Sequence, residues 1–572
     1  MLISNQSRVA KARRREDREV FFLFLRDLRA LAPWRIAFFL LLSVLTPRTS
    51  ARDQYCNPLD LLCADPFIYR EQDTYYLYAT SSDRGLLVWT SADLVNWQVK
   101  GFAFTRTDST WSQRHFWAPE LFKHKDKYYL HFTAMGQNKK RRIVLAQGES
   151  PLGPFQELKA PWFDPDKGTI DSHVFKDDDG KLYLYSVDLD RDDRKCFEIH
   201  ARRLRDDLVA HSDYTFCISP SQDWEGKVVN EGPFVFKHGD TYVLTYSANG
   251  YFDPNYSVGL ATSKSPLGPW TKQPDPILRR NKYVSGPGHH CFIDSPDHKE
   301  LFIAYHTHQH LENPSGERQL AIDRVKLIDS LTPVSEQGSR GTPREEQDPD
   351  SSRPHAPRQT LTLKVDGPTT QPTTLPSGSL PLVHGQSDDF SDNDLNDRRW
   401  NIFNERSRRW SLKDGHLVIL TEDGDVFEQR SDLHNLFLQY APQQDFTVTT
   451  RVKISPAQGH ESAFLTIWQN HNQFTKLAIV QTVKGLSFEV ARELSGRYSF
   501  DLYPAPATGD YHLRITRRQD TYTYSVSPDG ASWTNLATHQ ISLLNPRVGL
   551  GACSPESPRS IPASFDFLHF SH

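Results

Sequence analysis

The chain has 572 residues, which predicts about two to four domains, and its 67 Lys and Arg against 71 Asp and Glu give a formal net charge of −4. This balance excludes the strongly basic character that is typical of nucleic-acid-binding proteins. Only one apolar run approaches the length of a signal sequence, which excludes a protein with several membrane spans. Aromatic residues make up 12% of the chain, and because strands favour aromatic side chains, this excess indicates a β-rich protein.

Residues 1–51 differ in charge from the rest, with ten Lys and Arg against four Asp and Glu. A largely apolar run of ten residues, Ile36 to Leu45, follows Arg35 and leads to the small residues Thr49 and Ala51. This order is typical of a secretory signal that is cleaved after a small residue. The alternative is an uncleaved membrane anchor through residues 36–45, although such a run is short for a membrane span. We therefore expect a secreted protein.

Six cysteines fit an exported protein. Cys56 and Cys63 lie close together after the expected cleavage point, and Cys196 and Cys217 flank one expected hairpin. Each pair could form a disulfide in an oxidising compartment. No Cys or His spacing in the sequence predicts a zinc site.

An internal repeat runs through the next part of the chain. Five segments share an aromatic-aliphatic strand pattern, at residues 75–78, 128–131, 182–185, 242–245 and 301–304, and successive copies are 53, 54, 60 and 59 residues apart. Along the chain, most copies are preceded by a tight turn built from Asp, Gly or Lys, and this turn is preceded by another apolar segment. Units of several strands that repeat with this period predict the blades of a propeller. We expect an all-β protein in which residues 52–330 form a five-bladed β-propeller.

The composition changes after the fifth unit. Residues 331–385 are rich in Pro, Ser and charged residues and predict a flexible linker. From residue 386 to residue 572 the alternation of apolar and polar residues returns, for example at residues 417–420, 446–449 and 463–468. This pattern predicts a C-terminal β-sandwich.

Charged residues recur at one position of the repeat. The residue that precedes the first apolar strand is Asp65, Ala118, Asp171, Glu231 and His289 in units one to five. Because the first strand of each blade runs along the central channel, three carboxylates and a histidine are expected to converge at one end of it. Neighbouring carboxylates raise one another's pKa. Groups with unequal pKa values are what acid–base cleavage of a glycosidic bond requires.

Five short motifs give the resemblance to a known family. They read Ala-Asp-Pro-Phe-Ile from residue 64, Phe-Trp-Ala-Pro-Glu from 116, Ile-Asp-Ser from 170, Asn-Glu-Gly-Pro from 230 and Gly-Pro-Gly-His from 286. In this order and at blade spacing they resemble glycoside hydrolase family 43 over residues 64–330. The resemblance implies an inverting enzyme in which Asp65 is the general base, Glu231 the general acid and Asp171 the residue that tunes the acid. In an inverting enzyme the base and the acid are expected about 6.5–9.5 Å apart.

Three further residues are candidates for substrate binding. Trp117 could stack on a sugar ring, with core packing as the alternative. The resemblance implies that His289 contacts substrate or helps to hold a channel ion through water, and that Arg318 contacts sugar hydroxyls. A satisfied channel histidine and a solvated arginine at a strand end are the respective alternatives. Residues 255–257 match a glycosylation sequon.

The resemblance implies a carbohydrate substrate, with terminal arabinofuranosyl or xylosyl residues removed from plant-type polysaccharides or oligosaccharides. An endo-arabinanase or galactanase of the same family, a binding propeller that no longer hydrolyses, and a retaining fructan-active relative are alternatives. The sandwich resembles the concanavalin-like C-terminal domains of family members. No GxGxxG or phosphate-binding loop is present, so we expect no nucleotide cofactor. No metal ligand is predicted, although a calcium or sodium ion in the channel is compatible with the sequence.

Overall fold

The computed structural model describes residues 54–572, except residues 138, 164–167, 190–195, 210–213, 312–315, 333–357, 393, 396–398, 428–429, 507–508 and 556. The described part is built from strands, with two short 3-10 turns, η3 (Asp223–Glu225) and η4 (Ser407–Arg409), which confirms the all-β prediction. The predicted signal or anchor at 1–51 lies outside the described residues. In the described part, none of the helices is long and apolar enough to span a membrane.

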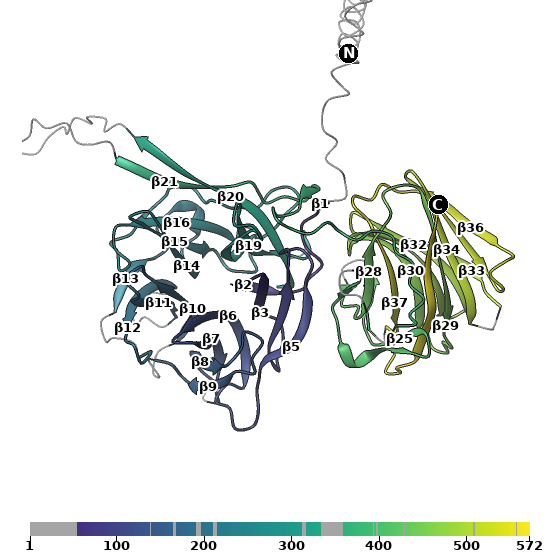
Figure 1. Cartoon of the computed structure of the whole chain (residues 1–572), viewed down its shortest axis with the longest axis horizontal. Coiled ribbons are helices and arrows are strands. Elements are labelled where there is room, and N and C mark those ends of the chain that lie inside the picture. Colours follow the sequence, from purple (N-terminus) through teal and green to yellow (C-terminus); the bar gives the residue numbers. More distant parts are fainter. Residues whose placement is uncertain are drawn as a thin grey trace, which may run out of the picture. The chain divides into compact units, whose positions relative to one another are not determined.

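Five four-stranded antiparallel sheets form a propeller, in agreement with the prediction (Figure 1). Blade one holds β2 (Ala64–Glu71), β3 (Thr74–Thr80), β4 (Gly85–Ser91) and β5 (Gln98–Thr105), and blade two holds β6 (Arg114–His124), β7 (Lys127–Met135), β8 (Arg141–Gly148) and β9 (Gln156–Lys159). Blade three holds β10 (Thr169–Lys176), β11 (Leu182–Asp188), β12 (Glu198–Leu204) and β13 (Thr215–Ile218). Blade four holds β14 (Asn230–His238), β15 (Thr241–Ala248), β16 (Ser257–Ser263) and β17 (Thr271–Lys272). Blade five holds β18 (Gly288–Asp294), β19 (Leu301–His308), β20 (Arg318–Thr332) and β21 (Arg358–Val365).

The repeated apolar segments are the second strands of the blades. Leu77, Leu130, Leu184, Leu244 and Ile303 are all fully buried. Both faces of such a strand pack against neighbouring blades, which explains why the segments are apolar almost throughout rather than alternating. The first strands β2, β6, β10, β14 and β18 contact one another in order, and β18 contacts β2 to complete the ring.

The ring is closed by the segment that precedes β2. The amides of Leu59 and Cys63 donate to the carbonyls of Leu320 and Arg318, and the amide of Leu320 donates to the carbonyl of Leu61. Nearby, β1 (Gln54–Tyr55) pairs with β22 (Thr373–Thr374). The first and last blades are thus joined by backbone hydrogen bonds, which hold residues at the start of β2 and β20 close together.

The boundary between propeller and linker differs from the prediction. Strand β21 lies inside the predicted linker 331–385, yet it pairs with β20 as the fourth strand of blade five. Its alternating sequence buries Leu361 and Leu363 against the fifth blade. The charged and Pro-rich composition of residues 337–358 obscured this short alternation in the sequence.

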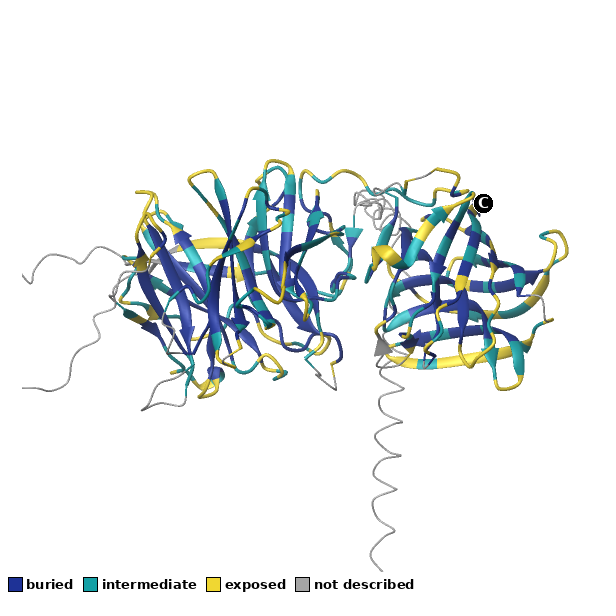
Figure 2. Cartoon of the chain, turned by 90° about the horizontal axis from the view of Figure 1, so that it is seen from below, coloured by how far each residue is buried: buried dark blue, intermediate teal, exposed yellow. Residues whose placement is uncertain are grey.

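The C-terminal part is a β-sandwich, as predicted. One sheet has the order β23 (Asn401–Phe403), β28 (Leu436–Tyr440), β37 (Arg547–Cys553), β30 (Ser462–Asn470), β31 (Gln473–Thr482), β32 (Gly485–Leu494) and β33 (Arg497–Pro504). The other has the order β24 (Trp410–Lys413), β25 (His416–Leu420), β38 (Pro562–Ser571), β29 (Phe446–Lys453), β34 (Asp510–Arg518), β35 (Thr521–Ser527) and β36 (Thr534–Gln540), and β26 (Val426–Phe427) pairs with β27 (Arg430–Ser431). Leu417, Val448, Leu465 and Ile479 come from both large sheets and pack in one core, drawn in dark blue in Figure 2.

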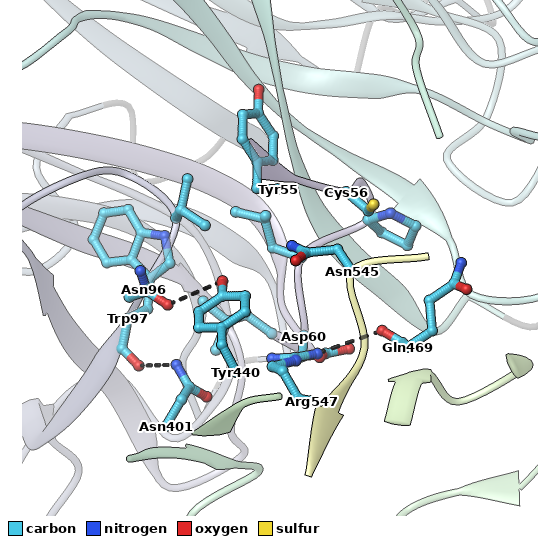
Figure 3. A pocket seen from close by; sticks show the side chains of 14 residues that line it. Tyr55, Cys56, Asp60, Asn96, Trp97, Asn401, Tyr440, Gln469, Asn545 and Arg547 are labelled. Atoms are coloured by element: carbon cyan, nitrogen blue, oxygen red, sulfur yellow. Dashed lines mark hydrogen bonds and ion pairs between the residues drawn. The ribbon is translucent and has the colours of Figure 1, made fainter. Parts of the chain in front are cut away.

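Cys56, Cys63, Cys217, Cys291 and Cys553 are free thiols in the structure, so neither the Cys56–Cys63 nor the Cys196–Cys217 disulfide is formed. Cys63 is buried in the core of the first and fifth blades. Cys56 lies instead on a small cavity of about 40 Å³ that is also lined by residues of the sandwich (Figure 3).

Polar contacts connect the propeller sequence with the sandwich around that cavity. Asp60 forms an ion pair with Arg547 and accepts a hydrogen bond from the indole of Trp468 at 3.2 Å. The amide of Asn401 donates to the carbonyl of Trp97 at 3.3 Å (Figure 3). Trp468 is 1% exposed, so it belongs to the core of the sandwich rather than to a sugar-binding surface.

Candidate active site

The first strand of every blade has an irregularity at the same position. Each β-ladder shifts register just after the pairs Ala64–Thr80, Trp117–Thr133, Ile170–Val187, Glu231–Ser247 and Gly288–His306. The next residues, Asp65, Ala118, Asp171, Gly232 and His289, all have positive φ angles, between 44° and 55°. Four of the five are not glycine, and such backbone strain is concentrated at functional sites.

This register corrects the alignment made from the sequence. Glu231 does not occupy the position of Asp65, Asp171 and His289, because Gly232 does. Glu231 lies one residue earlier, where the residue as a whole is buried to the same extent as Asp65 and Asp171. The three carboxylates still lie near one another, because Nδ1 of His289 is within 4.0 Å of both Asp65 and Asp171, and the residue after Glu231 donates its amide to Asp171.

The bulged residues are held by hydrogen bonds from blade to blade. The amides of Ala118, Asp171 and His289 donate to hydroxyls of Thr80, Thr133 and Ser247, and the amide of Asp65 donates to Nδ1 of His306. In blade three the corresponding position is Val187, whose side chain cannot accept a hydrogen bond. The amide of Gly232 donates instead to Oδ2 of Asp171 at 3.2 Å. The missing acceptor thus places the Asp171 carboxylate against the residue next to Glu231.

Asp65 is surrounded by hydrogen-bond donors. Arg318 donates to Oδ1 at 2.7 Å, and the hydroxyl of Thr80 donates to Oδ2 at 2.6 Å. Nδ1 of His289 lies 3.4 Å from Oδ1. Burial opposes ionisation, but the Arg318 guanidinium and the two neighbouring histidines outweigh it and hold the pKa of Asp65 well below its usual range. The carboxylate is therefore ionised, as a base must be.

The surroundings of Glu231 and Asp171 raise their pKa values, in contrast to those of Asp65. Burial raises the pKa of Glu231 to about 7, against the effect of the Tyr256 hydroxyl, which donates to Oε1 at 2.9 Å. Burial and the charges of Glu231 and Asp65 raise the pKa of Asp171 to about 7, against the effect of His289. Because burial and neighbouring negative charge both disfavour ionisation, the pair of Asp171 and Glu231 retains a proton near neutral pH. One carboxylate is therefore available as an acid beside an ionised base.

Two glycines explain the Gly-Pro-Gly-His motif. A Cβ atom on Gly288 would lie 2.4 Å from the ring of Tyr256, and one on Gly286 would lie 2.2 Å from the ring of His308. Gly288 thus leaves room for the side chain that binds Glu231. Tyr256 was not predicted from the sequence, although it is the central residue of the 255–257 sequon.

The three predicted substrate-binding residues lie at or near the carboxylates. His289 lies between Asp65 and Asp171, with Nδ1 4.0 Å from Oδ2 of Asp171. Arg318 binds Asp65 directly. The ring of Trp117 is only partly buried and stacks on His115 at 4.6 Å, with the guanidinium of Arg141 4.5 Å from its centroid.

A second pair of polar residues lies deeper on the same strands. Nδ1 of His173 contacts Oε2 of Glu120 at 2.8 Å, and Nε2 donates to the carbonyl of Val235 at 3.1 Å. These contacts connect β6, β10 and β14, and Glu120 and His173 each lie two residues after the bulged residue of their strand. Burial raises the pKa of Glu120, and the neighbouring histidine opposes this effect. Glu120 stands between Pro119 and Leu121, and His173 follows Asp171 and Ser172, so the sequence gave no signal that these two residues pair.

A hollow of about 390 Å³ opens beside Asp65, within the size range of ligand sites. Its lining includes Ala64, Thr80 and Arg318, which adjoin or contact Asp65, together with Trp117, Gln309 and Glu317. Asn404 and Asp432 of the sandwich also line it. The sandwich thus contributes polar groups to the wall of the hollow.

Two channel histidines, His131 and His290, contact hydroxyl groups. Among the residues that the structure describes, no three His, Cys, Asp or Glu side chains are grouped to hold a metal ion. His131 contacts the hydroxyl of Ser172 at 2.7 Å, and His290 contacts that of Thr245 at 2.7 Å. This donor set does not fit an ion that is bound directly by protein side chains.

A propeller channel that holds an ionised carboxylate beside protonatable ones defines a class of hydrolytic enzymes that act on glycosides. The family model for "Glycosyl hydrolases family 43" matches residues 55–332, and the model for "Beta xylosidase C-terminal Concanavalin A-like domain" matches residues 387–571. The chain belongs to glycoside hydrolase family 43 and is a glycosidase.

Similar proteins match one or both domains. An extracellular exo-α-(1→5)-L-arabinofuranosidase of Streptomyces chartreusis is 28% identical over 45% of this chain and 84% of its own length. A xylan 1,3-β-xylosidase of a Vibrio species is 23% identical over 82% of this chain and 88% of its own. The crystal structure of the GH43 BlXynB protein from Bacillus licheniformis has a TM-score of 0.54 at 20% identity and covers 90% of this chain and 99% of its own, which shows the shared fold.

Proposed function

We propose that the protein removes terminal arabinofuranosyl or xylosyl residues from plant-type polysaccharides or oligosaccharides, with inversion at the anomeric carbon. The observation that carries this proposal is the unequal environment of three buried carboxylates at one end of the channel, with Asp65 paired to Arg318 and Glu231 kept protonatable by burial. The names of the similar arabinofuranosidase and xylosidase support the choice of sugars.

In the proposed reaction, Asp65 accepts a proton from a water molecule that attacks the anomeric carbon. Glu231 donates its proton to the glycosidic oxygen as the bond to the leaving sugar breaks. Asp171 disfavours loss of that proton because a second negative charge beside Glu231 is costly. Arg318 and His289 hold Asp65 in place and keep it ionised. Water supplies the hydroxyl group of the released sugar, so the chemistry of these residues requires no cofactor.

The first experiment measures release of nitrophenol from nitrophenyl α-L-arabinofuranoside and nitrophenyl β-D-xyloside. It compares residues 52–572 with the Glu231→Gln variant. We expect release from at least one substrate, and loss of activity on oligosaccharides in the variant. If the chain hydrolyses neither nitrophenyl substrate and neither arabinan nor galactan, it is a binding protein and the proposal is wrong.

A second experiment separates the acid from the base. Glu231→Ala is expected to retain activity on substrates with a good leaving group, because these need little protonation, whereas Asp65→Ala is expected to lose activity on good and poor leaving groups alike. Equal losses on both substrate types in Glu231→Ala would remove the acid assignment. Product analysis by NMR reports the anomeric configuration, and initial release of the retained anomer would exclude inversion.

We also propose that residues 1–51 direct export of the chain. The support is the order of basic, apolar and small residues before Ala51, together with the word extracellular in the name of the Streptomyces relative. Expression in a secreting host followed by N-terminal sequencing tests this proposal. A new N-terminus at residue 52 is expected, whereas a membrane-bound full-length chain would indicate the anchor through residues 36–45.

A further inference from the structure

Two aromatic side chains stand out from the surface in the loop between β15 and β16. Tyr251 is 44% exposed and Phe252 is 61% exposed. Their rings meet edge to face, with centroids 5.4 Å apart. Most other aromatic side chains of the propeller pack in its cores. Adjacent exposed aromatic rings of this kind are typical of ligand-binding surfaces.

The pair lies beside the candidate active site. The Arg318 guanidinium, which donates to Asp65, lies 4.7 Å from the centroid of the Tyr251 ring. A Cβ atom on Gly316 would lie 3.5 Å from the same ring, in ordinary contact. Gly316 and Arg318 both line the hollow beside Asp65. Tyr251 therefore lies at the edge of that hollow.

The loop is held firmly by hydrogen bonds. Nε2 of His308 donates to the carbonyl of Tyr251 at 2.7 Å, and its Nδ1 accepts from the hydroxyl of Ser285 at 3.0 Å. Gly286 leaves the space that the His308 ring occupies and donates to the carbonyl of Pro254 at 3.0 Å. The exposure of the two rings is therefore a property of a fixed loop.

The same loop carries the hydrogen-bond partner of the proposed acid. Tyr256, at the end of the loop, donates to Glu231 at 2.9 Å. The acid protonates the oxygen of the leaving sugar, so that sugar must lie against Glu231. One short loop thus contacts the acid at one end and presents two exposed rings at the other.

We propose that Tyr251 and Phe252 form a stacking platform for the leaving-group sugar, the ring on the far side of the bond that is cleaved. The ligand is a pentose or hexose unit of an oligosaccharide, whose C–H face packs on the aromatic rings. The platform favours oligosaccharides over substrates with small leaving groups. This inference rests on the proposed function, since it assigns a part of the same site.

The test compares two substrates that share one terminal sugar. The first is a disaccharide or trisaccharide, and the second is the methyl glycoside, whose alkoxide leaving group demands similar protonation but offers no ring to stack. In Phe252→Ala and Tyr251→Ala, the ratio of kcat/KM for the oligosaccharide to kcat/KM for the methyl glycoside is expected to fall by about 2- to 10-fold for each ring removed. Phe252→Trp is expected to preserve the ratio.

Phe500→Ala is the matched control. Phe500 lies on β33 of the sandwich and is 51% exposed, similar to Phe252, and its ring centroid lies 6.0 Å from that of Tyr498 on the same strand. In Phe500→Ala, the ratio of kcat/KM for the oligosaccharide to kcat/KM for the methyl glycoside is expected to equal that of the unmodified chain. A ratio that stays within twofold of the unmodified chain in both Phe252→Ala and Tyr251→Ala would overturn the proposal.

A binding measurement separates this inference from the proposed function. Titration calorimetry of the trisaccharide into Glu231→Gln, with and without Phe252→Ala, requires no turnover. Weaker binding by about 2- to 10-fold on loss of the ring supports the platform even if the unmodified chain cleaves none of the substrates. Unchanged binding overturns it, whereas cleavage by the unmodified chain tests the proposed function alone.

Discussion

The Asp65–Arg318 ion pair offers the sharpest test of how the proposed base is kept ionised. Both side chains are 10% exposed, and the nearest nitrogen and oxygen are 2.7 Å apart. Arg318→Met removes the charge but keeps a long side chain in the same space, and Arg318→Lys retains a positive charge as the control. An opposite charge this close lowers the pKa of a carboxyl by about 1–3 units, so its loss is expected to raise the pKa of Asp65 by that amount.

The assay is the pH dependence of kcat/KM, because its acid limb reports the pKa of the base in the free enzyme. The limb of Arg318→Met is expected about 1–3 pH units above that of the unmodified chain, and the limb of Arg318→Lys is expected to stay close to it. A general loss of substrate binding would lower the whole curve without moving the limb. If the acid limb of Arg318→Met coincides with that of the unmodified chain, the role of Arg318 is refuted. The same holds if the acid limbs of Arg318→Met and Arg318→Lys shift equally.

Thermal unfolding provides an independent reading of the same pair. Removing one partner of a buried ion pair costs about 3–5 kcal/mol of stability, because the remaining charge is left uncompensated. The folded-state pKa of Asp65 is depressed, so its contribution to stability is present above its unfolded pKa and is lost as the pH falls through the folded value. The difference in Tm between Arg318→Met and the unmodified chain is therefore expected to be largest near pH 7 and to narrow below about pH 4. A gap that is constant with pH would contradict this linkage.

Three further variants test the residues around Glu231, the proposed acid. Asp171→Asn removes a negative charge beside Glu231 and is expected to move the basic limb of the kcat/KM profile to lower pH, whereas an unmoved limb would make Asp171 a structural residue. Tyr256→Phe removes a hydroxyl that favours the ionised form of Glu231, so the limb is expected to rise by about 1 unit, and a fall would contradict the hydrogen bond seen at 2.9 Å. Gly288→Ala adds a methyl group 2.4 Å from the Tyr256 ring and is expected to lower kcat more than 10-fold, while near-normal turnover would show that the ring can move aside freely.

The propeller could be predicted because every blade places one strand in the same buried environment. Its second strand is buried on both faces, which requires an apolar segment at a regular interval, and this requirement is visible at residues 75–78 and 182–185. The fourth strand of blade five has no such requirement. Arg358–Val365 is a strand with one row of buried residues, Leu361 and Leu363, and such short alternation is easily masked by the charged and Pro-rich stretch before it.

The candidate site could be predicted only in part, for a similar reason. Carboxylates at a repeated position give a pattern that is visible in the sequence, so Asp65 and Asp171 were found with their places in the fold. The partners that set the pKa values of Asp65 and Glu231 come from distant segments. Arg318 begins β20, and Tyr256 lies in the loop between β15 and β16, so the repeat of apolar strands points to neither of them. Burial and pairing, which decide the protonation states, emerge only when the blades close into a ring.

The position of Glu231 shows how the repeat is adapted to chemistry. Had the fourth blade placed a carboxylate at residue 232, it would occupy the same backbone position as Asp65 and Asp171. Gly232 occupies that position instead, at a φ of 55°, and its amide binds Asp171 because Val187 offers no acceptor. The acid is thereby displaced by one residue, and the additional methylene of Glu relative to Asp lets its carboxyl reach the hydroxyl of Tyr256. Two changes where blades three and four meet, an aliphatic residue at 187 and a glycine at 232, thus direct the Asp171 carboxylate to the residue beside Glu231, while Asp65 is paired with Arg318.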